Sequence, residues 1–238
     1  MGQEPPRRST EVRDHTVRRV LVSVEGQTEE ALVTQVLQGH LLRHAVWLQP
    51  VVVQTKRLAS GRKHRGGIAS WQQARRDIMG LLGDTAAAMV TTMYDLYALP
   101  ADVPGMADRE QHPPGLARAR HVEAAMAEDV GDPRFLPYLS LHEVEALVLA
   151  APADTIQPAA AASAVADLTP LQGLPEPETI NESDPPSKRL LACWPDYSKS
   201  IDGPQIVAKA GVTHVRGACP HFGSWLEALE GVGTDVAR

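Results

Sequence analysis

Short apolar runs, each bounded by polar residues, alternate with amphipathic segments along the first two thirds of the sequence. The apolar runs predict β-strands and cover residues 17–24, 47–54, 87–93 and 135–141. The amphipathic segments repeat apolar residues at helical spacing and cover residues 28–42, 68–82 and 116–130. Thr28 is placed to cap the first of these helices. Strands that alternate with helices predict an α/β fold with a mostly parallel sheet flanked by helices.

The character of the sequence changes after residue 150. Residues 159–166 are rich in alanine and predict a short helix, whereas residues 170–186 are rich in proline and acid and predict an irregular connection. No internal repeat is visible. We therefore expect a single domain over residues 17–238 that follows a disordered leader over residues 1–16. Within this domain we expect a core over 17–150 and a helical C-terminal cap over 151–238.

Composition narrows the class of protein. With 238 residues the chain can bury a proper core, and with only 4% aromatic residues that core must be mostly aliphatic. No apolar run is long enough to cross a bilayer, and residues 1–14 lack the apolar segment of a signal peptide. Cys193 and Cys219 are too few for a disulfide framework, so we expect a cytoplasmic protein in which both are small buried hydrophobes. The net charge of −6 argues against nonspecific nucleic-acid binding, although local charge decides phosphate contacts.

Acidic residues follow three of the predicted strands. Glu25 ends the first strand, and Glu29 lies one helical turn later. Asp95 follows the third run, while Glu143 and Glu145 follow the fourth, where alternation along an extended segment would put them on one face. Ligands gather outside the carboxyl ends of parallel strands, so these acids are expected to converge. Converging carboxylates repel one another unless they bind a hard divalent cation such as Mg²⁺ or Mn²⁺.

Each of these acids also has a purely structural interpretation. Glu29 could simply favour the dipole of its helix, and Asp95 could begin a turn. Glu143 and Glu145 could form a solvated helix start. We expect His142 to pack beside the site or support its ligands, because hard oxygen sites rarely recruit imidazole.

Several stretches of the sequence resemble known protein families. Residues 25–29, which read EGQTE after the first strand, resemble the opening motif of Toprim domains, the metal-binding module of topoisomerases, primases and the overcoming-lysogenization-defect nucleases. More closely, the chain resembles a bacterial Toprim-like family known as domain of unknown function 4276. The matching stretches are residues 24–30, 55–67, 90–100, 131–147, 186–190 and 219–222. The resemblance implies a Toprim-like, Rossmann-like α/β fold.

The resemblance also assigns roles to individual acids. Glu25 matches the Toprim glutamate, which is a metal ligand in the nucleases and has been assigned as a general acid in topoisomerases. Glu29 falls where the nuclease branch places a second acid, and Asp95 matches the first acid of the Toprim aspartate pair. The second acid of that pair is replaced by Tyr97, although an aromatic residue there resembles the pattern of this particular family.

The replacement by Tyr97 leaves the number of ions open. Glu143 and Glu145 could restore the missing ligands, as the nuclease branch uses an acid from the following strand. The resemblance therefore implies one or two Mg²⁺ or Mn²⁺ ions held by Glu25, Glu29, Asp95, Glu143 and Glu145.

Basic residues could bind a phosphate backbone beside the acidic site. Glycines lie among the cations of residues 55–67, which suits a loop that approaches a phosphate backbone closely. The predicted phosphate-binding residues are Lys56, Arg57, Arg62, Lys63, Arg65, Arg189 and Lys199. Lys188 is the candidate to steady the departing oxygen. A solvated loop and surface ion pairs remain the alternatives for these residues.

The expected function is metal-dependent hydrolysis of nucleic acid, with Glu25, Asp95 and Lys188 as catalytic residues. DNA and RNA both remain open as substrates, as does a homodimer, and the resemblance implies an anti-phage defence setting. One alternative is another metal-dependent phosphate-transfer enzyme. Another is a non-catalytic subunit beside a separate ABC- or AAA-type ATPase, since this chain has no phosphate-binding loop of its own. A topoisomerase or primase fragment is disfavoured at this length.

Overall fold

Five parallel strands form one sheet at the centre of the protein. The computed structural model describes residues 16–53, 67–160, 171, 177–179 and 186–234. The strands are β1 (Arg18–Val24), β2 (Val46–Val52), β3 (Ala87–Asp95), β4 (Phe135–Leu136) and β5 (Leu139–Ser140). Their order is β2-β1-β3-β4, with β5 also paired to β3, and every pairing is parallel. The predicted α/β fold with a parallel sheet is therefore confirmed.

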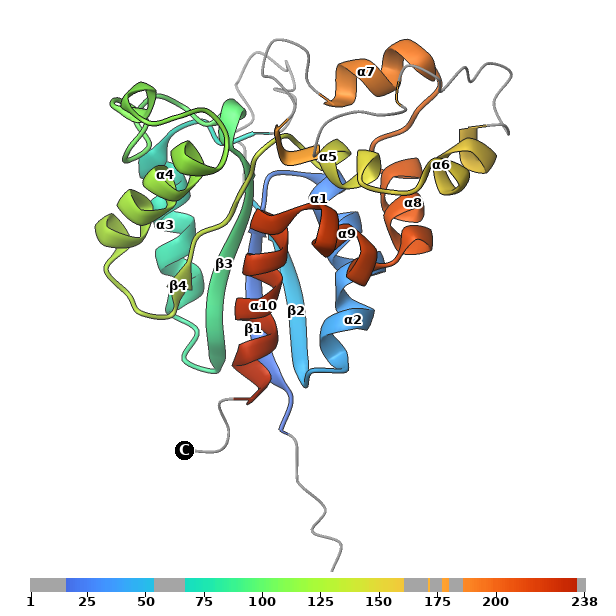
Figure 1. Cartoon of the computed structure of the whole chain (residues 1–238). Coiled ribbons are helices and arrows are strands. Elements are labelled where there is room, and N and C mark those ends of the chain that lie inside the picture. The colour runs from blue at the N-terminus through green and yellow to red at the C-terminus, as the bar shows by residue number, and fades with distance from the viewer. Residues whose placement is uncertain (1–15, 54–66, 161–170, 172–176, 180–185, 235–238) are drawn as a thin grey trace, which may run out of the picture.

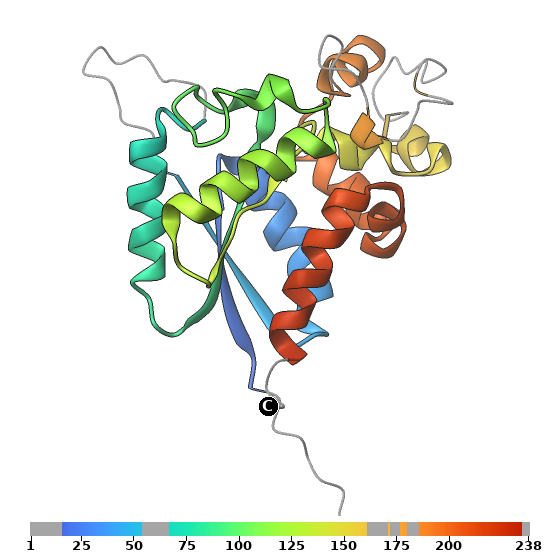
Figure 2. The same cartoon turned by 60° about the vertical axis from the view of Figure 1, so that its left-hand side comes forward.

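Helices cover both faces of this sheet (Figures 1 and 2). The N-terminal ones are α1 (Gln27–Leu32), the π-helical η1 (Val33–Leu37), α2 (Gln38–Leu42), α3 (Trp71–Leu82) and α4 (Leu116–Val130). The C-terminal ones are α5 (Glu145–Leu149), α6 (Ala153–Ala160), α7 (Pro186–Cys193), α8 (Asp202–Ala210), α9 (Val212–Ala218) and α10 (Pro220–Thr234). Short 3-10 turns are η2 (Leu96–Ala98), η3 (Arg109–Gln111) and η5 (Pro177–Thr179). No helix in these described ranges combines the length and apolar character that a membrane span requires.

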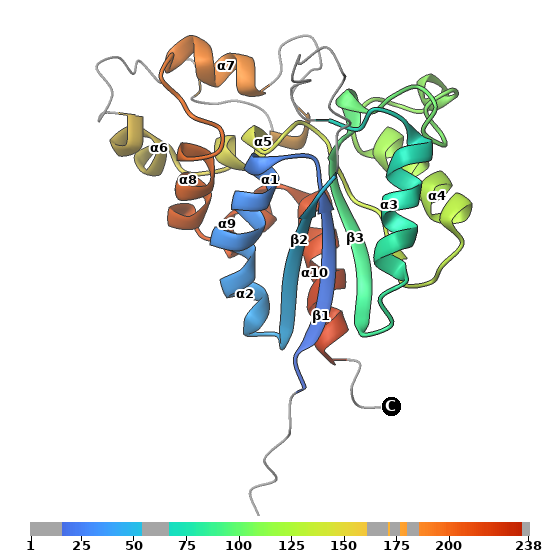
Figure 3. The same cartoon turned by 180° about the vertical axis from the view of Figure 1, so that it is seen from behind.

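Alternation along β1 divides the core into two layers. Val20, Val22 and Val24 are fully buried against η1, α2 and α10, whereas Leu21 joins α3 and α4 on the opposite face. Figure 3 shows these two groups of helices on either side of the strands. Both faces of the central strand are thus withdrawn from water, which accounts for its nearly continuous aliphatic sequence. The carboxyl ends of β1 and β3 point to the top of Figure 1, where α5 and α7 lie.

Specific polar contacts fix α10 on the sheet. The buried indole Nε1 of Trp225 donates to Thr91 Oγ1 on β3 at 2.9 Å. At the start of α10, the buried carboxylate of Glu178 accepts the backbone N–H groups of His221 and Phe222 at 2.8 and 3.0 Å. A carboxylate on unpaired N–H groups of a helix N-terminus satisfies them and favours the helix dipole. The last helix is therefore part of the layer that supports β1 and β2.

Several predicted boundaries need correction. Thr28 is not the cap of the first helix, because the helix begins at Gln27 and Gly26 occupies the N-cap position without a side-chain hydrogen bond. The strand predicted over residues 135–141 is divided into β4 and β5. Pro137 explains the division, since it has no N–H for the ladder, and Tyr138 instead donates its N–H to the Thr92 hydroxyl at 2.9 Å. Residues 1–15 of the predicted leader and residues 161–166 of the predicted alanine-rich helix lie outside the described residues.

Two glycines near the end of α10 provide a matched test of its packing. A Cβ on Gly233 would overlap the carbonyl oxygen of His44, whereas a Cβ on Gly231 would meet nothing within 4 Å. We expect Gly233→Ala to lower the free energy of unfolding by about 1–3 kcal/mol, as overpacking does. Gly231→Ala should raise it by up to about 1 kcal/mol, because alanine favours the helix. Urea denaturation of both variants checks this pair, and equal effects would contradict the packing of α10.

Candidate metal centre

The carboxyl ends of β1 and β3 bring two acids together. Val24 pairs with Met93 in the parallel register, so Glu25 follows β1 at the level where Asp95 ends β3. The backbone N–H of Asp95 donates to Glu25 Oε1 at 2.7 Å. Asp95 Oδ1 in turn accepts the backbone N–H of Tyr97 at 3.0 Å, so both carboxylates are held in place from the main chain. The prediction that these two acids converge is confirmed by this contact.

Burial and mutual repulsion disfavour the charged forms of these acids. Burial first, and then the charges of Asp95, Glu29 and Glu143, together raise the pKa of Glu25 to about 8 against the effect of the Asp95 N–H. The pKa of Asp95 is raised to about 6, again first by burial, with Glu143 and Glu29 contributing in the same direction. The pKa of Glu29 is also raised, first by burial. These acids form one cluster that is short of positive charge.

Two glycines bring main chain close to the cluster. Gly26 lies at the start of α1, where its Cβ would be 3.6 Å from Glu29 Oε2. Gly67 has φ +141°, a conformation that favours glycine, and its Cβ would be 3.8 Å from Glu25 Oε2. On the other side of β1, the N–H of Val53 donates to the Val24 carbonyl at 2.9 Å. Val53 and Gly67, the described residues nearest to the basic stretch of the sequence, therefore both lie close to the end of β1.

Glu143 and Glu145 reach the site by a different route from the predicted one. They do not alternate along an extended segment: Glu143 lies in a turn with φ +43°, and Glu145 is the first residue of α5. The reason is that β5 ends at Ser140, after only two residues. Both carboxylates nevertheless meet one cation, since Lys199 Nζ lies 3.0 Å from Glu143 Oε1 and 3.3 Å from Glu145 Oε1.

Lys199 is electrostatically coupled to four of the five acids, Glu29, Asp95, Glu143 and Glu145. Burial lowers its pKa, but Glu145 and Glu143 outweigh that effect, so the pKa is raised. Burial raises the pKa of Glu145 to about 7, against the effect of Lys199. The lysine also lowers the pKa of Glu29 and of Asp95. Five carboxylates and one ammonium group therefore share the carboxyl end of the sheet.

Tyr97 and His142 form a wall beside the acids. Their rings stack with centroids 5.2 Å apart, and His142 is buried. The backbone N–H of Tyr97 thus donates to Asp95, while the Tyr97 ring stacks on His142. This geometry agrees with the packing role expected for His142.

The remaining predicted residues divide into two groups. Lys188 is exposed and Arg189 half-buried on α7, which packs against α5 above the strand ends (Figure 1). The basic residues predicted between the second strand and α3 lie outside the described residues. They are Lys56, Arg57, Arg62, Lys63 and Arg65.

Two residues that support the turn carrying Lys199, Asp202 and Tyr197, were not recognised as such from the sequence. The N–H of Ser198 donates to Asp202 Oδ2 at 2.7 Å, which closes the turn that carries Lys199. Tyr197 is buried beneath this turn, and Gly203 is needed there because a Cβ would lie 2.9 Å from the Tyr197 hydroxyl. The only sequence signal was the polar stretch of residues 197–204, whose partner on α5 is far away along the chain.

A second polar cluster lies away from the strand ends. His40 Nε2 lies 2.6 Å from Glu230 Oε1 and His44 Nε2 3.9 Å from it, an arrangement that could hold a metal ion. However, Arg216 donates to the same Glu230 oxygen at 2.9 Å, and Arg43 lies 3.1 Å from His40 Nδ1. Two arginines thus balance the one carboxylate, and we interpret the cluster as a junction between α2 and α10.

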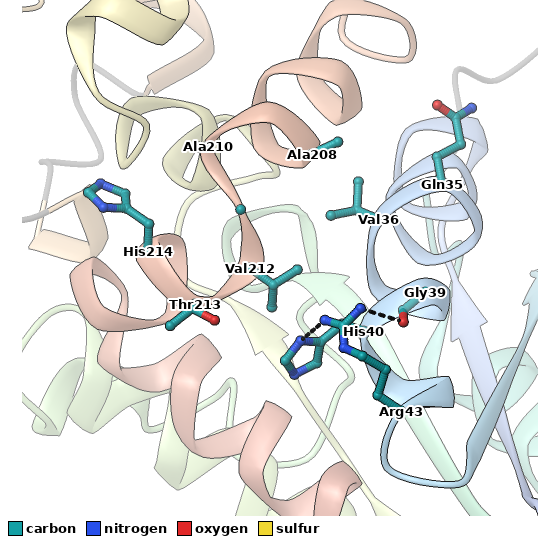
Figure 4. Close-up of a pocket in the computed structure, with 11 residues that line it drawn as sticks. Gln35, Val36, Gly39, His40, Arg43, Ala208, Ala210, Val212, Thr213 and His214 are labelled. Carbon is teal, nitrogen blue, oxygen red and sulfur yellow. Dashed lines mark hydrogen bonds between the residues drawn. The ribbon is translucent and has the colours of Figure 1, made fainter.

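Beside this junction is a pocket of about 680 Å³ between η1–α2 and α8–α9 (Figure 4). His40 and Arg43 lie on one wall, with Val212 and Thr213 on the other. None of the five clustered carboxylates lines it. The pocket is therefore separate from the candidate metal centre.

Comparison with known proteins identifies a family. The sequence model described as Domain of unknown function (DUF4276) matches residues 24–230, a range that includes all five clustered acids and Lys199. No curated protein and no solved structure shows a significant match to the chain. The chain thus belongs to the DUF4276 family, as its sequence motifs had indicated.

Proposed function

We propose that this protein is a Mg²⁺- or Mn²⁺-dependent nuclease that hydrolyses phosphodiester bonds. The observation that carries the proposal is the convergence of Glu25, Glu29, Asp95, Glu143 and Glu145 at the carboxyl end of a parallel sheet. The raised pKa values of Glu25, Glu29 and Asp95 indicate a site that lacks cationic charge. The likeness of residues 25–29 to the Toprim motif supports the same chemistry, and we propose this relationship together with the function.

The donor set suits a hard divalent cation. Every candidate ligand is a carboxylate, the donor that Mg²⁺ and Mn²⁺ prefer. Glu143 Oε2 is buried and has no hydrogen-bond partner among the described residues, so this oxygen is free to face a bound ion. A bound ion would acidify a water molecule and neutralise the scissile phosphate. Glu25 and Asp95, held by main-chain N–H groups, are the principal ligands of the proposal, with Glu29 beside them.

The basic residues supply the other requirement, a hold on the phosphate backbone. The sequence between Val53 and Gly67 contains Lys56, Arg57, Arg62, Lys63 and Arg65, which lie outside the described residues. Basic side chains of this kind are proposed to bind the phosphate backbone of the substrate. Exposed Lys188 on α7 is proposed to steady the departing oxygen. A nucleic acid is thus the proposed partner, and a defence role is proposed only from the Toprim resemblance.

The first prediction concerns cleavage. Purified protein with Mn²⁺ or Mg²⁺ should cleave supercoiled plasmid or total RNA, and EDTA should abolish this. Glu25→Gln and Asp95→Asn should each reduce the rate at least about 100-fold, because each removes a charged ligand while keeping the shape of the side chain. Glu128→Gln, which neutralises an exposed acid on α4, is the matched control and should cleave normally.

The same experiment separates the alternative roles. Cleavage that survives Glu25→Gln and Asp95→Asn would reject the proposed site. Nucleic-acid binding without cleavage under every metal condition would instead favour a non-catalytic subunit that works with a separate ATPase.

The second prediction concerns pH. A cation must displace the protons of acids whose pKa values are raised, to about 8 for Glu25 and about 6 for Asp95. Mn²⁺ affinity should therefore rise as pH increases from about 5 to about 9, with proton release on binding. In Glu25→Gln the rise at the alkaline end should be lost. Calorimetry in buffers of different ionisation enthalpy measures both quantities, and affinity independent of pH would contradict the assignment.

A further inference from the structure

We propose that Lys199 takes the place of a second metal ion, so that the centre binds one divalent cation rather than two. The inference rests on the proposed metal-dependent function. It specifies which acids of the site bind the metal ion and which bind the lysine. Glu143 and Glu145 would then hold the ammonium group, leaving Glu25, Glu29 and Asp95 as the ligands of the single ion.

Contacts place the ammonium group where a cation is needed. Lys199 Nζ bridges Glu143 Oε1 at 3.0 Å and Glu145 Oε1 at 3.3 Å, and the Glu145 side chain is only 1% exposed. A buried carboxylate requires a nearby cation or a proton, and here the lysine provides the cation. The positive charge of Lys199 also opposes the rise in the pKa of Glu29 and of Asp95. The lysine therefore acts on the proposed metal ligands as well as on Glu143 and Glu145.

The backbone around these residues is built to hold this arrangement. On the lysine side, Ser198 and Asp202 close the turn with two hydrogen bonds, from Ser198 N to Asp202 Oδ2 at 2.7 Å and from Asp202 N to Ser198 O at 2.8 Å. On the acidic side, Glu143 adopts φ +43°, an unfavourable conformation for a non-glycine residue. Backbone strain of this kind persists where the surrounding structure requires it. Lys199, whose side chain is 39% exposed, thus meets the acids from a turn that these hydrogen bonds hold closed.

Both the positive charge of Lys199 and the number of remaining carboxylates favour one ion. A second divalent ion on Glu143 and Glu145 would lie against the ammonium group and be repelled by it. Tyr97 adds no carboxylate at the position that would hold such an ion. The three remaining acids are enough for one hard cation, which commonly completes its coordination with water.

The test counts ions directly in the full-length protein. Mn²⁺ binding is measured by calorimetry and electron paramagnetic resonance at pH about 8, which is above the raised pKa of Asp95 and close to that of Glu25. The wild-type protein should bind one Mn²⁺, and Lys199→Met should bind two with a spin-coupled spectrum. Lys199→Arg, which keeps a cation, and Lys209→Met, which removes an exposed lysine on α8, should each bind one.

The possible outcomes separate this inference from the proposed function. Two ions in the wild-type protein, or one in a folded Lys199→Met variant, would overturn the role of Lys199 and leave the metal centre standing. No ion in the wild-type protein would reject the metal centre itself. Circular dichroism establishes that each variant is folded, and if Lys199→Met does not fold, the wild-type count still decides.

Discussion

The carboxylates at the ends of β1 and β3 lose most of their hydration on folding, and the surrounding structure compensates for that loss. Burying charged groups is costly unless they are paired or protonated, and this site buries several at once. The main chain offsets part of that cost, since Glu25 and Asp95 accept backbone N–H groups at 2.7 and 3.0 Å. Lys199 offsets another part on Glu143 and Glu145. The remaining imbalance appears as the raised pKa values of Glu25 and Asp95.

The fold explains how such a site can be maintained. Parallel strands place Glu25 and Asp95 at one level, and aliphatic layers on both faces make the sheet rigid beneath them. The C-terminal helices close the arrangement, since α10 is bonded to β3 through Trp225 while the turn before α8 delivers Lys199. A domain of this kind can therefore hold repelling groups close together because the stability of its core lies elsewhere.

Local sequence patterns predicted the fold and the position of two acids well. Glu25 and Asp95 could be located because each directly follows an aliphatic strand, and the carboxyl ends of parallel strands meet. Glu143 and Glu145 were correctly grouped but for the wrong reason, as Pro137 interrupts the strand and a turn intervenes. The Lys199–Glu143 contact spans 56 residues. No local periodicity encodes such a contact, because it depends on how α5 and α8 pack.

Anomalous diffraction from crystals soaked in Mn²⁺ shows whether the buried acids hold a divalent cation. At pH about 8, above the raised pKa of Asp95 and close to that of Glu25, a peak should lie beside Glu25 and Asp95 and disappear in Glu25→Gln. No peak at these residues, or a peak only at His40, His44 and Glu230, would contradict a metal centre at the strand ends.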